Sequence, residues 1–112
     1  MRIGIPVFTP GVEISLEALA TRAARLPKID IEPPRELIGR STVTAIQSGI
    51  VYGFAGQVDG IVGRLREEMG EITAIATGGL ASSIAPFCDQ IDETDDLLTL
   101  TGLRLIWERN QA

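Results

Sequence analysis

Apolar side chains recur every three or four residues through one long segment of the chain, residues 41–69. They are Val43, Ile46, Ile50, Phe54, Val58, Ile61, Leu65 and Met69. This spacing is that of one face of an α-helix. Ser41 or Thr42 can cap the first free N–H groups, and Gly70 follows the segment as a C-cap. The pattern predicts one helix over residues 41–69, around which the rest of the chain is arranged.

A second face of this predicted helix carries glycine at steps of three or four residues. We call it the glycine face, and it consists of Gly49, Gly53, Gly56, Gly60 and Gly63. A glycine inside a helix costs about 0.5–1 kcal/mol relative to alanine, so this set predicts that another backbone packs closely there. Two interpretations are open: a tight contact inside one domain, or self-association with a second copy. A membrane dimer motif is excluded, because Gln47, Asp59 and Arg64 are polar or charged.

The pattern before the long helix predicts a strand, a helix and a linker. Residues 2–8 alternate between apolar and other side chains, and a proline inside this run would place the strand at a sheet edge. Ser15 is expected to cap a helix that Pro27 ends. Residues 28–34 are expected to be extended, and residues 37–38 are expected to form a very short strand.

The pattern after the long helix predicts a strand, a helix, a second short strand and a last helix. Residues 72–76 are nearly all apolar, which is typical of a strand buried on both faces of a sheet. A helix over residues 80–86 and a strand over residues 88–92 are expected to follow. Thr99 is expected to cap the last helix. The apolar side chains expected to face inward from it are Leu100, Leu103, Ile106 and Trp107. The element order predicts a mixed α/β fold that is richer in helix.

Length and composition limit the classes of protein. With 112 residues the chain is one domain at most, and we assign residues 1–112 to it. It has no apolar run of about 18 residues and no small-residue cleavage site, so we expect a cytoplasmic protein without a membrane span. The net charge of −5 repels a phosphate backbone, which argues against nucleic-acid binding. A mean hydropathy of +0.21 indicates that a partner covers some apolar surface.

Histidine is absent and Cys88 is the only cysteine. These two facts exclude a disulfide framework, histidine general bases and the usual zinc sites. Asp59 is expected to be a buried hydrogen-bond acceptor, whereas the acidic loop at residues 92–96 and the pair Glu67 and Glu68 are expected to be solvated. No metal site is assigned, since this acidic spacing matches no calcium loop.

The first candidate site is the run Gly39-Arg40-Ser41-Thr42 at the start of the long helix. The free N–H groups and partial positive charge of a helix N-terminus bind anions. Gly39 allows close backbone approach, Arg40 can neutralise a phosphate, and the two hydroxyls can bond it. The alternative is that Ser41 or Thr42 only caps the helix. Spacing alone leaves both interpretations open.

The second candidate site is the run Thr77-Gly78-Gly79 between a predicted strand and a predicted helix. Paired glycines let a flat ring or a phosphate lie against the backbone at the carboxyl end of a strand, where ligands bind in α/β sheets. The alternative is a tight turn that simply needs glycine.

Taken in order, several segments form a specific set. They are Pro10-Gly11, IGRSTVTAIQSGIVYG at 38–53, VDGIV at 58–62, IATGGLA at 75–81 and LTLTGLRLIWERN at 98–110. This set resembles the C-terminal part of a type III pantothenate kinase. The resemblance implies an actin-like, ribonuclease-H-like kinase fold with a small mixed sheet. It also implies a cytoplasmic homodimer that transfers the γ-phosphate of ATP to the hydroxyl of pantothenate in coenzyme A synthesis, with Mg²⁺ and a monovalent cation, K⁺ or NH₄⁺.

The resemblance also implies roles for the two candidate sites. The residues implied to bind substrate and phosphate are Gly39, Arg40, Ser41 and Thr42. Of these, Thr42 is implied to be catalytic, because it would bond the substrate or the transferring phosphoryl group. The residues implied to lie on the adenosine side are Thr77, Gly78 and Gly79. The glycine face would then lie at or beside the dimer contact.

Some segments that the resemblance leads us to expect have no counterpart in this chain. They are the D-x-G-N-T phosphate loop, the Gly-x-Asp-Arg segment with the catalytic aspartate, and the D-x-G-T-A segment that binds phosphate and cation. We therefore expect a fragment, a split-gene product or a truncated paralogue that is inactive without a separate N-terminal half. The alternative is a non-catalytic dimerisation or regulatory module, of the kind labelled Bvg accessory factor, which kept the packing face and lost the chemistry.

Overall fold

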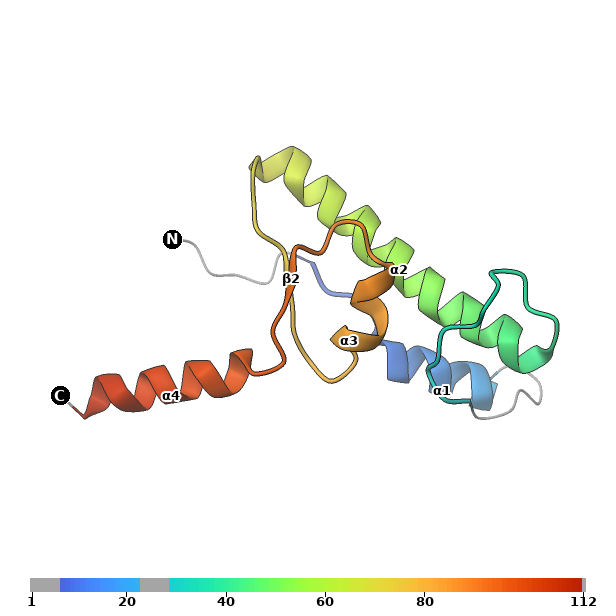
Figure 1. Ribbon diagram of the computed structural model, residues 1–112, viewed down its shortest axis with the longest axis horizontal. Coiled ribbons are helices and arrows are strands. Elements are labelled where there is room, and N and C mark those ends of the chain that lie inside the picture. Colours follow the sequence, from blue (N-terminus) through green and yellow to red (C-terminus); the bar gives the residue numbers. More distant parts are fainter. Residues whose placement is uncertain (1–6, 23–28, 112) are drawn as a thin grey trace.

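The computed structural model describes residues 7–22 and 29–111, and it is rich in helix with one small sheet (Figure 1). In chain order the elements are α1 (Val12–Arg22), α2 (Thr42–Met69), β1 (Ile75–Ala76), α3 (Ala81–Ile84), the 3₁₀-helix η1 (Ala85–Phe87), β2 (Glu93–Thr94) and α4 (Leu98–Asn110). This order confirms the predicted mixed α/β content. The sheet consists of β1 and β2, which pair in parallel with Ile75 opposite Glu93 and Ala76 opposite Thr94.

The longest element, α2, is the predicted central helix. It runs for 28 residues, so it is about 42 Å long. Ser41 is its N-cap, and the Ser41 hydroxyl accepts a hydrogen bond from the backbone N–H of Thr44. At the other end Gly70 has a φ of 81°, and its N–H bonds the carbonyl of Arg66. Both caps were predicted, and both are confirmed.

The core lies where α3 and η1 cover the middle of α2. Its buried apolar side chains are Ile50, Val51, Ala55 and Ile84. The rings of Tyr52 on α2 and Phe87 on η1 meet edge to face with their centroids 5.5 Å apart, a favoured aromatic geometry. Ser48 is also buried, and its hydroxyl bonds the carbonyl of Leu37. This core is small for a chain of this length.

Arg66, near the end of α2, holds the loops that carry the two strands. Its guanidinium donates to the carbonyls of Ile72 at 2.7 Å and Gln90 at 2.9 Å, and it bonds the carboxylate of Asp92 at 2.8 Å. The same Asp92 oxygen accepts the N–H of Ala74 at 2.7 Å. The acidic loop is therefore not merely solvated, as the sequence suggested, because Asp92 fixes the two strands to α2.

The first half of the chain corrects several predictions. The strand over residues 2–8 falls mainly on residues outside the described part, and Val7 and Phe8 belong to no strand. Ser15 is not a cap: its N–H already bonds the carbonyl of Gly11 at 3.1 Å, so it lies in the first turn of α1. The expected end at Pro27 also lies outside the described residues. Residues 37–38 form a bend rather than a strand.

The second half also differs from the predicted elements. Residues 72–76 give only the two-residue strand β1, and Ile75 is 47% exposed, so the prediction of a strand buried on both faces is wrong. No strand forms over residues 88–92. There the carboxylate of Asp59 accepts hydrogen bonds from the N–H groups of Asp89 and Gln90, both at 2.9 Å. A strand would need these N–H groups to pair with a neighbouring strand. Asp59 is thus the hydrogen-bond acceptor that was predicted, and it is half-buried.

The last helix, α4, begins earlier and packs less than predicted. Its N-cap is Leu97, so Thr99 lies inside the helix and does not cap it. The side chains expected to face inward are exposed, and α4 extends away from α2 and α3 (Figure 1). The molecule measures 57 × 33 × 25 Å with a Cα radius of gyration of 17.0 Å. A compact domain of this length would have a radius of about 13 Å.

No helix in residues 7–22 and 29–111 is long and apolar enough to cross a membrane.

Candidate functional site

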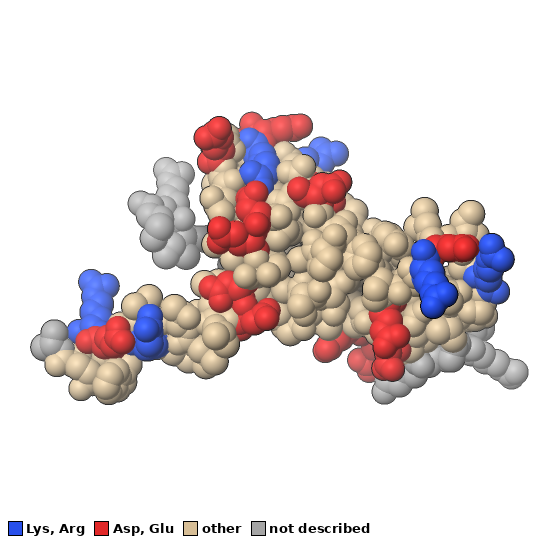
Figure 2. All heavy atoms as spheres, in the orientation of Figure 1, with Lys and Arg blue, Asp and Glu red and all other residues tan. Residues whose placement is uncertain are grey.

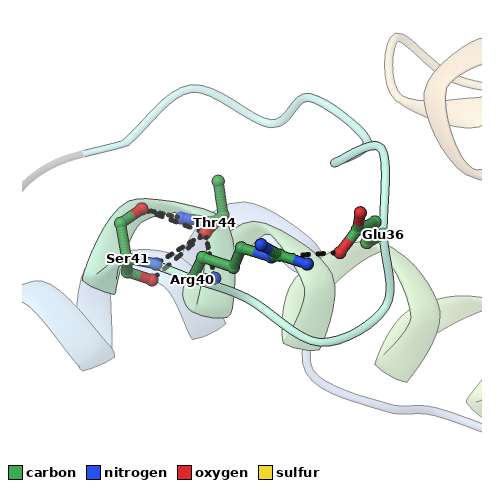
Figure 3. A network of polar contacts seen from close by, with 4 residues as sticks. All are labelled: Glu36, Arg40, Ser41 and Thr44. Carbon is green, nitrogen blue, oxygen red and sulfur yellow. Dashed lines mark hydrogen bonds and ion pairs between the residues drawn. The ribbon is translucent and has the colours of Figure 1, made fainter.

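The run from Arg40 to Thr44 forms a closed network of hydrogen bonds at the start of α2 (Figure 3). The Thr44 side-chain oxygen accepts the backbone N–H groups of Arg40 and Ser41, both at 3.0 Å. In return the Ser41 hydroxyl accepts the N–H of Thr44 at 3.2 Å, which completes a capping box. The backbone that carries the first candidate site is therefore held in one conformation.

The two hydroxyls that the sequence left as alternatives have different partners. Ser41 is the cap, and its hydroxyl also lies 3.0 Å from that of Thr44. Thr42 lies in the first turn, is exposed, and makes no side-chain hydrogen bond with any other residue that the structure describes. The capping interpretation is thus right for Ser41 only. The hydroxyl of Thr42 remains open to a ligand at the positive end of α2.

Arg40 presents its charge to solvent beside these hydroxyls. Its guanidinium is paired with Glu36 at 3.3 Å, and the two side chains are 85% and 61% exposed (Figure 3). A pair this exposed contributes at most about 1 kcal/mol, so an anionic ligand can compete with Glu36. Arg40 is therefore available to neutralise negative charge near Thr42.

Gly39 allows a close contact, but the contact is with another residue of the chain rather than with a ligand. A Cβ built on Gly39 would lie 2.8 Å from the Cβ of Ala45 and would clash with the backbone of Ala45. The predicted close approach is therefore present. Its partner is the first turn of α2, so Gly39 positions the loop.

A hollow of about 510 Å³ lies against this network. Its lining residues are Pro33, Pro34, Arg35, Glu36, Ile38, Arg40 and Thr44. The volume is within the range of about 300–1,000 Å³ typical of ligand clefts. Sequence reasoning missed Arg35. Its position right after a Pro-Pro pair was the available signal, because that pair restricts the backbone that leads to Arg35.

The second candidate run forms a turn at the end of β1. Gly78 has a φ of +105°, which L side chains rarely adopt, so the turn itself requires glycine. Thr77 donates its hydroxyl to the carbonyl of Asp95 at 2.7 Å and so ties this turn to the segment after β2. Gly79 is different: its φ is ordinary, and a Cβ built there meets no described atom within 4 Å.

This turn forms one wall of a polar hollow of about 360 Å³. Its lining residues are Thr77, Gly78, Gly79, Ser82, Asp96 and Thr99. Sequence reasoning had treated Asp96 as part of a solvated loop and Thr99 as a helix cap. The pairing of β1 with β2 and the hydrogen bond from Thr77 to Asp95 bring the segment after β2 beside the turn, so these residues and the glycines line one hollow. The two hollows have no residue in common, and of the first candidate run only Arg40 lines its hollow.

Two titratable side chains outside the candidate runs, Cys88 and Asp92, have a shifted pKa. Partial burial raises the pKa of the Cys88 thiol, and the carboxylates of Asp59 and Asp89 add to that shift. The hydrogen bond from the Ala74 N–H, followed by that from Arg66, lowers the pKa of Asp92. Residues 7–22 and 29–111 contain no group of three or more Cys, Asp or Glu side chains that could hold a metal ion.

Comparison with known proteins decides the family. The model of the type III pantothenate kinase family matches residues 6–64, which include the first candidate site and the whole glycine face. The chain belongs to the type III pantothenate kinase family. The resemblance drawn from the sequence motifs is thereby confirmed.

Curated members of the family match nearly all of this chain. A type III pantothenate kinase of Frankia alni is 56% identical over 105 residues, which cover 93% of this chain and 42% of the relative. One of an Exiguobacterium species is 54% identical over 105 residues, covering 94% and 41%. One of Streptomyces griseus is 54% identical over 108 residues, covering 93% and 41%. The chain thus spans about two-fifths of the length of the type III pantothenate kinases that it matches.

Proposed function

We propose that these 112 residues form the C-terminal part of a single type III pantothenate kinase domain with an actin-like fold. The complete enzyme would transfer the γ-phosphate of ATP to the hydroxyl of pantothenate, and this part would not do so alone. One observation carries the proposal: at the start of α2, Ser41 is used as the cap while Thr42 keeps an exposed, unbonded hydroxyl beside Arg40.

The first candidate site would hold the substrate and the transferring phosphoryl group. Phosphoryl transfer depends mainly on positioning and on charge stabilisation. In this proposal the Thr42 hydroxyl bonds the substrate or the phosphoryl oxygen, and Arg40 balances its negative charge. Ser41 and Gly39 keep the loop in place through the capping box and through the close contact with Ala45.

The second candidate site would hold the adenosine side of ATP. The turn exposes backbone at Gly78 and Gly79, against which a flat ring can lie. Asp96 and Thr99 line the same hollow as the glycines and offer oxygen acceptors for the hydroxyl groups of a ribose. The bond from Thr77 to Asp95 would keep the two walls at a fixed separation.

The remaining parts of the proposal come from the resemblance. The enzyme would be a cytoplasmic homodimer that uses Mg²⁺ and K⁺ or NH₄⁺. We assign no described residue to either cation. The glycine face would meet the second copy, since none of its five glycines has a described atom within 4 Å of an added Cβ. The described residues make no tight contact with this face, and the alternative of a tight contact inside one domain stays open for residues outside the described part.

Calorimetry of pantothenate and ATP binding to the purified chain tests this proposal. Thr42→Ala should weaken pantothenate binding about fivefold or more, because it removes one hydrogen bond. Ser41→Ala is the matched control: it should cost about 1 kcal/mol of stability and leave binding near normal once folded. Gly79→Ala should weaken ATP binding without loss of stability, since the added methyl group meets no atom of the described residues within 4 Å.

The outcomes separate the proposal from its alternative. If neither ligand binds while the solution mass is that of a dimer, the proposal fails. The open glycine face then favours the non-catalytic dimerisation module. Pantothenate-dependent ADP release from the chain alone would contradict the statement that it is inactive by itself.

A further inference from the structure

A further hollow adjoins the polar hollow of the second candidate run, and its volume is about 370 Å³. Strand β2 supplies one side of it through Glu93 and Thr94, and η1 supplies another through Ala85 and Pro86. Ser82 on α3 lines both hollows, so the two meet there. The proposed function does not use this further hollow, which we call the β2 hollow.

The β2 hollow lies along the edge of β2 that β1 does not cover. The N–H of Glu93 bonds the carbonyl of Ala74 at 3.2 Å. Two residues further on, the N–H of Asp95 bonds the carbonyl of Ala76 at 2.9 Å. Successive residues of a strand direct their backbone groups to opposite edges, so the N–H and carbonyl of Thr94 point away from β1. Outside the ladder no described residue bonds either group. Thr94 lines the hollow, whereas neither residue of β1 does.

The unpaired groups of Thr94 give the hollow a donor next to an acceptor. A ligand that fits them needs an acceptor next to a donor along one edge of a flat ring. Adenine has this edge, because its N1 accepts a hydrogen bond and its 6-amino group donates one. A 6-oxopurine such as hypoxanthine has the reverse, N1–H next to a carbonyl, so each of its groups would meet a like group. The edge of β2 at Thr94 therefore has the chemistry that distinguishes adenine from a 6-oxopurine.

The other walls of the β2 hollow also suit a purine rather than a phosphate. Ala85, Pro86 and Ile91 are apolar, so a flat ring placed against them loses apolar contact with water. Glu93 adds an exposed carboxylate, whose negative charge repels a phosphate. The volume of the hollow is within the range typical of ligand clefts.

We propose that Thr94 recognises the adenine base of ATP through its backbone N–H and carbonyl. This inference rests on the proposed function and deepens it, since it states which nucleotide the kinase prefers. The purine ring passes the glycine turn and Ser82, so that N1 and the 6-amino group reach Thr94. The ribose stays beside Asp96 and Thr99 in the polar hollow. Thr94 is thus a specificity-determining residue, and it takes no part in the transfer of the phosphoryl group.

Calorimetric titration of the full 112-residue chain with ATP and with inosine triphosphate tests the inference. The two nucleotides share the sugar and the three phosphates and differ in the edge of the base. ATP should bind about tenfold more tightly or better, because inosine triphosphate leaves both groups of Thr94 without a partner. In an NMR titration, the backbone amide signal of Thr94 should shift with ATP and stay in place with inosine triphosphate.

Thr94→Pro removes the N–H on which the inference depends and leaves the ladder bonds of Glu93 and Asp95 in place. Proline is tolerated in an edge strand where the N–H points away from the sheet. The preference for ATP should fall to less than about twofold, whereas Thr94→Val, which keeps the N–H, should retain the preference. Ile75→Pro is the matched control. It removes an outward N–H at the other edge of the same sheet, away from the β2 hollow, and should leave the preference unchanged.

Two outcomes would overturn the inference. One is that the chain does not distinguish the two nucleotides, whether it binds both equally or binds neither. The other is a Thr94→Pro chain that is folded by circular dichroism and keeps the preference for ATP. Either result can occur while Thr42→Ala still weakens pantothenate binding, in which case the proposed function stands without the inference. A preference for ATP that Thr94→Pro removes, in a chain that binds no pantothenate, supports the inference and rejects the proposed function.

Discussion

At the residue scale, the glycines of the two candidate runs have different structural roles. Gly39 lies against the backbone of Ala45, so its lack of a side chain permits a contact within the chain. Gly78 has a φ of +105°, so it permits a backbone conformation. Gly79 has neither constraint in the free chain. The structure therefore separates glycines needed for folding from one that is free to serve a ligand.

Gly39→Ala is expected to destabilise the chain by about 1–3 kcal/mol, because the new methyl group overlaps the first turn of α2 and the loop must move. Urea unfolding followed by circular dichroism measures this. Gly79→Ala is the control and should be near neutral, since its methyl group has no described neighbour within 4 Å. Equal stability of the two variants would contradict the placement of Gly39.

Asp92 makes the free energy of unfolding of the chain depend on pH in the acidic range. The pKa of Asp92 is lowered from its ordinary value of 3.8 by the Ala74 N–H and by Arg66. A lowered pKa in the folded state means that the ionised form stabilises the fold, fully above the unfolded pKa. This contribution is therefore lost as the pH falls below 3.8 toward the lowered pKa. Asp92→Asn should reduce stability at pH 7 and flatten that acid-dependent loss, as measured by unfolding at a series of pH values.

At the element scale, α2 supports three different contacts along its length. Its first turn carries the candidate phosphate site, its middle packs against α3 and η1, and its last turns hold the strands through Arg66. Asp59 is the only charged residue between Arg40 and Arg64, and Figure 2 shows few charged side chains over the middle of the molecule. The glycine face is thus an open and nearly uncharged surface on a helix that is well capped at both ends.

Gly53→Leu is expected to convert a dimer of the chain into a monomer, because a large side chain prevents close approach at the glycine face. Helix content should be kept or increased, since leucine favours a helix by up to about 1 kcal/mol over glycine. Light scattering and circular dichroism measure the two effects. Glu68→Leu, on an exposed part of α2 outside the glycine face, is the control and should leave the mass unchanged. A Gly53→Leu chain that stays dimeric would reject the glycine face as the dimer contact.

At the scale of the whole molecule, the described residues are extended rather than compact. The Cα radius of gyration is 17.0 Å, and α4 lies apart from the other helices (Figure 1). Large apolar side chains are exposed along the chain, including Leu37 in the bend before α2, Met69 on α2 and Trp107 on α4. These features are consistent with a chain that spans about two-fifths of the length of its relatives.

Small-angle scattering tests this shape. The monomeric Gly53→Leu chain should have a radius of gyration near 17 Å rather than the value of about 13 Å for a compact domain of this length. The reason is that the small core cannot draw α4 onto α2. A radius near the compact value would mean that α4 folds back onto the body when no partner is present.

The sequence pattern correctly predicted the element that depends on interactions between residues close together in the chain. The apolar period and the flanking Ser41 and Gly70 defined α2, because capping and helical spacing depend on residues within one turn. The short strands were predicted less well. Their position depends on hydrogen bonds from distant residues: Asp59 prevents a strand over residues 88–92, and Arg66 with Asp92 fixes the loops near β1 and β2.

The sequence by itself determined the family, the central helix and the two glycine-containing runs, since order, spacing and residue type are properties of the chain. Tertiary structure alone decided which groups remain free. It assigned the cap to Ser41 and left Thr42 open, placed Gly39 against Ala45, and brought Asp96 into the hollow that Gly79 lines. These outcomes depend on contacts between segments of the chain. A polar group that bonds another segment in the folded chain is no longer free to bind a ligand, and residue spacing in the sequence does not show which groups form such bonds.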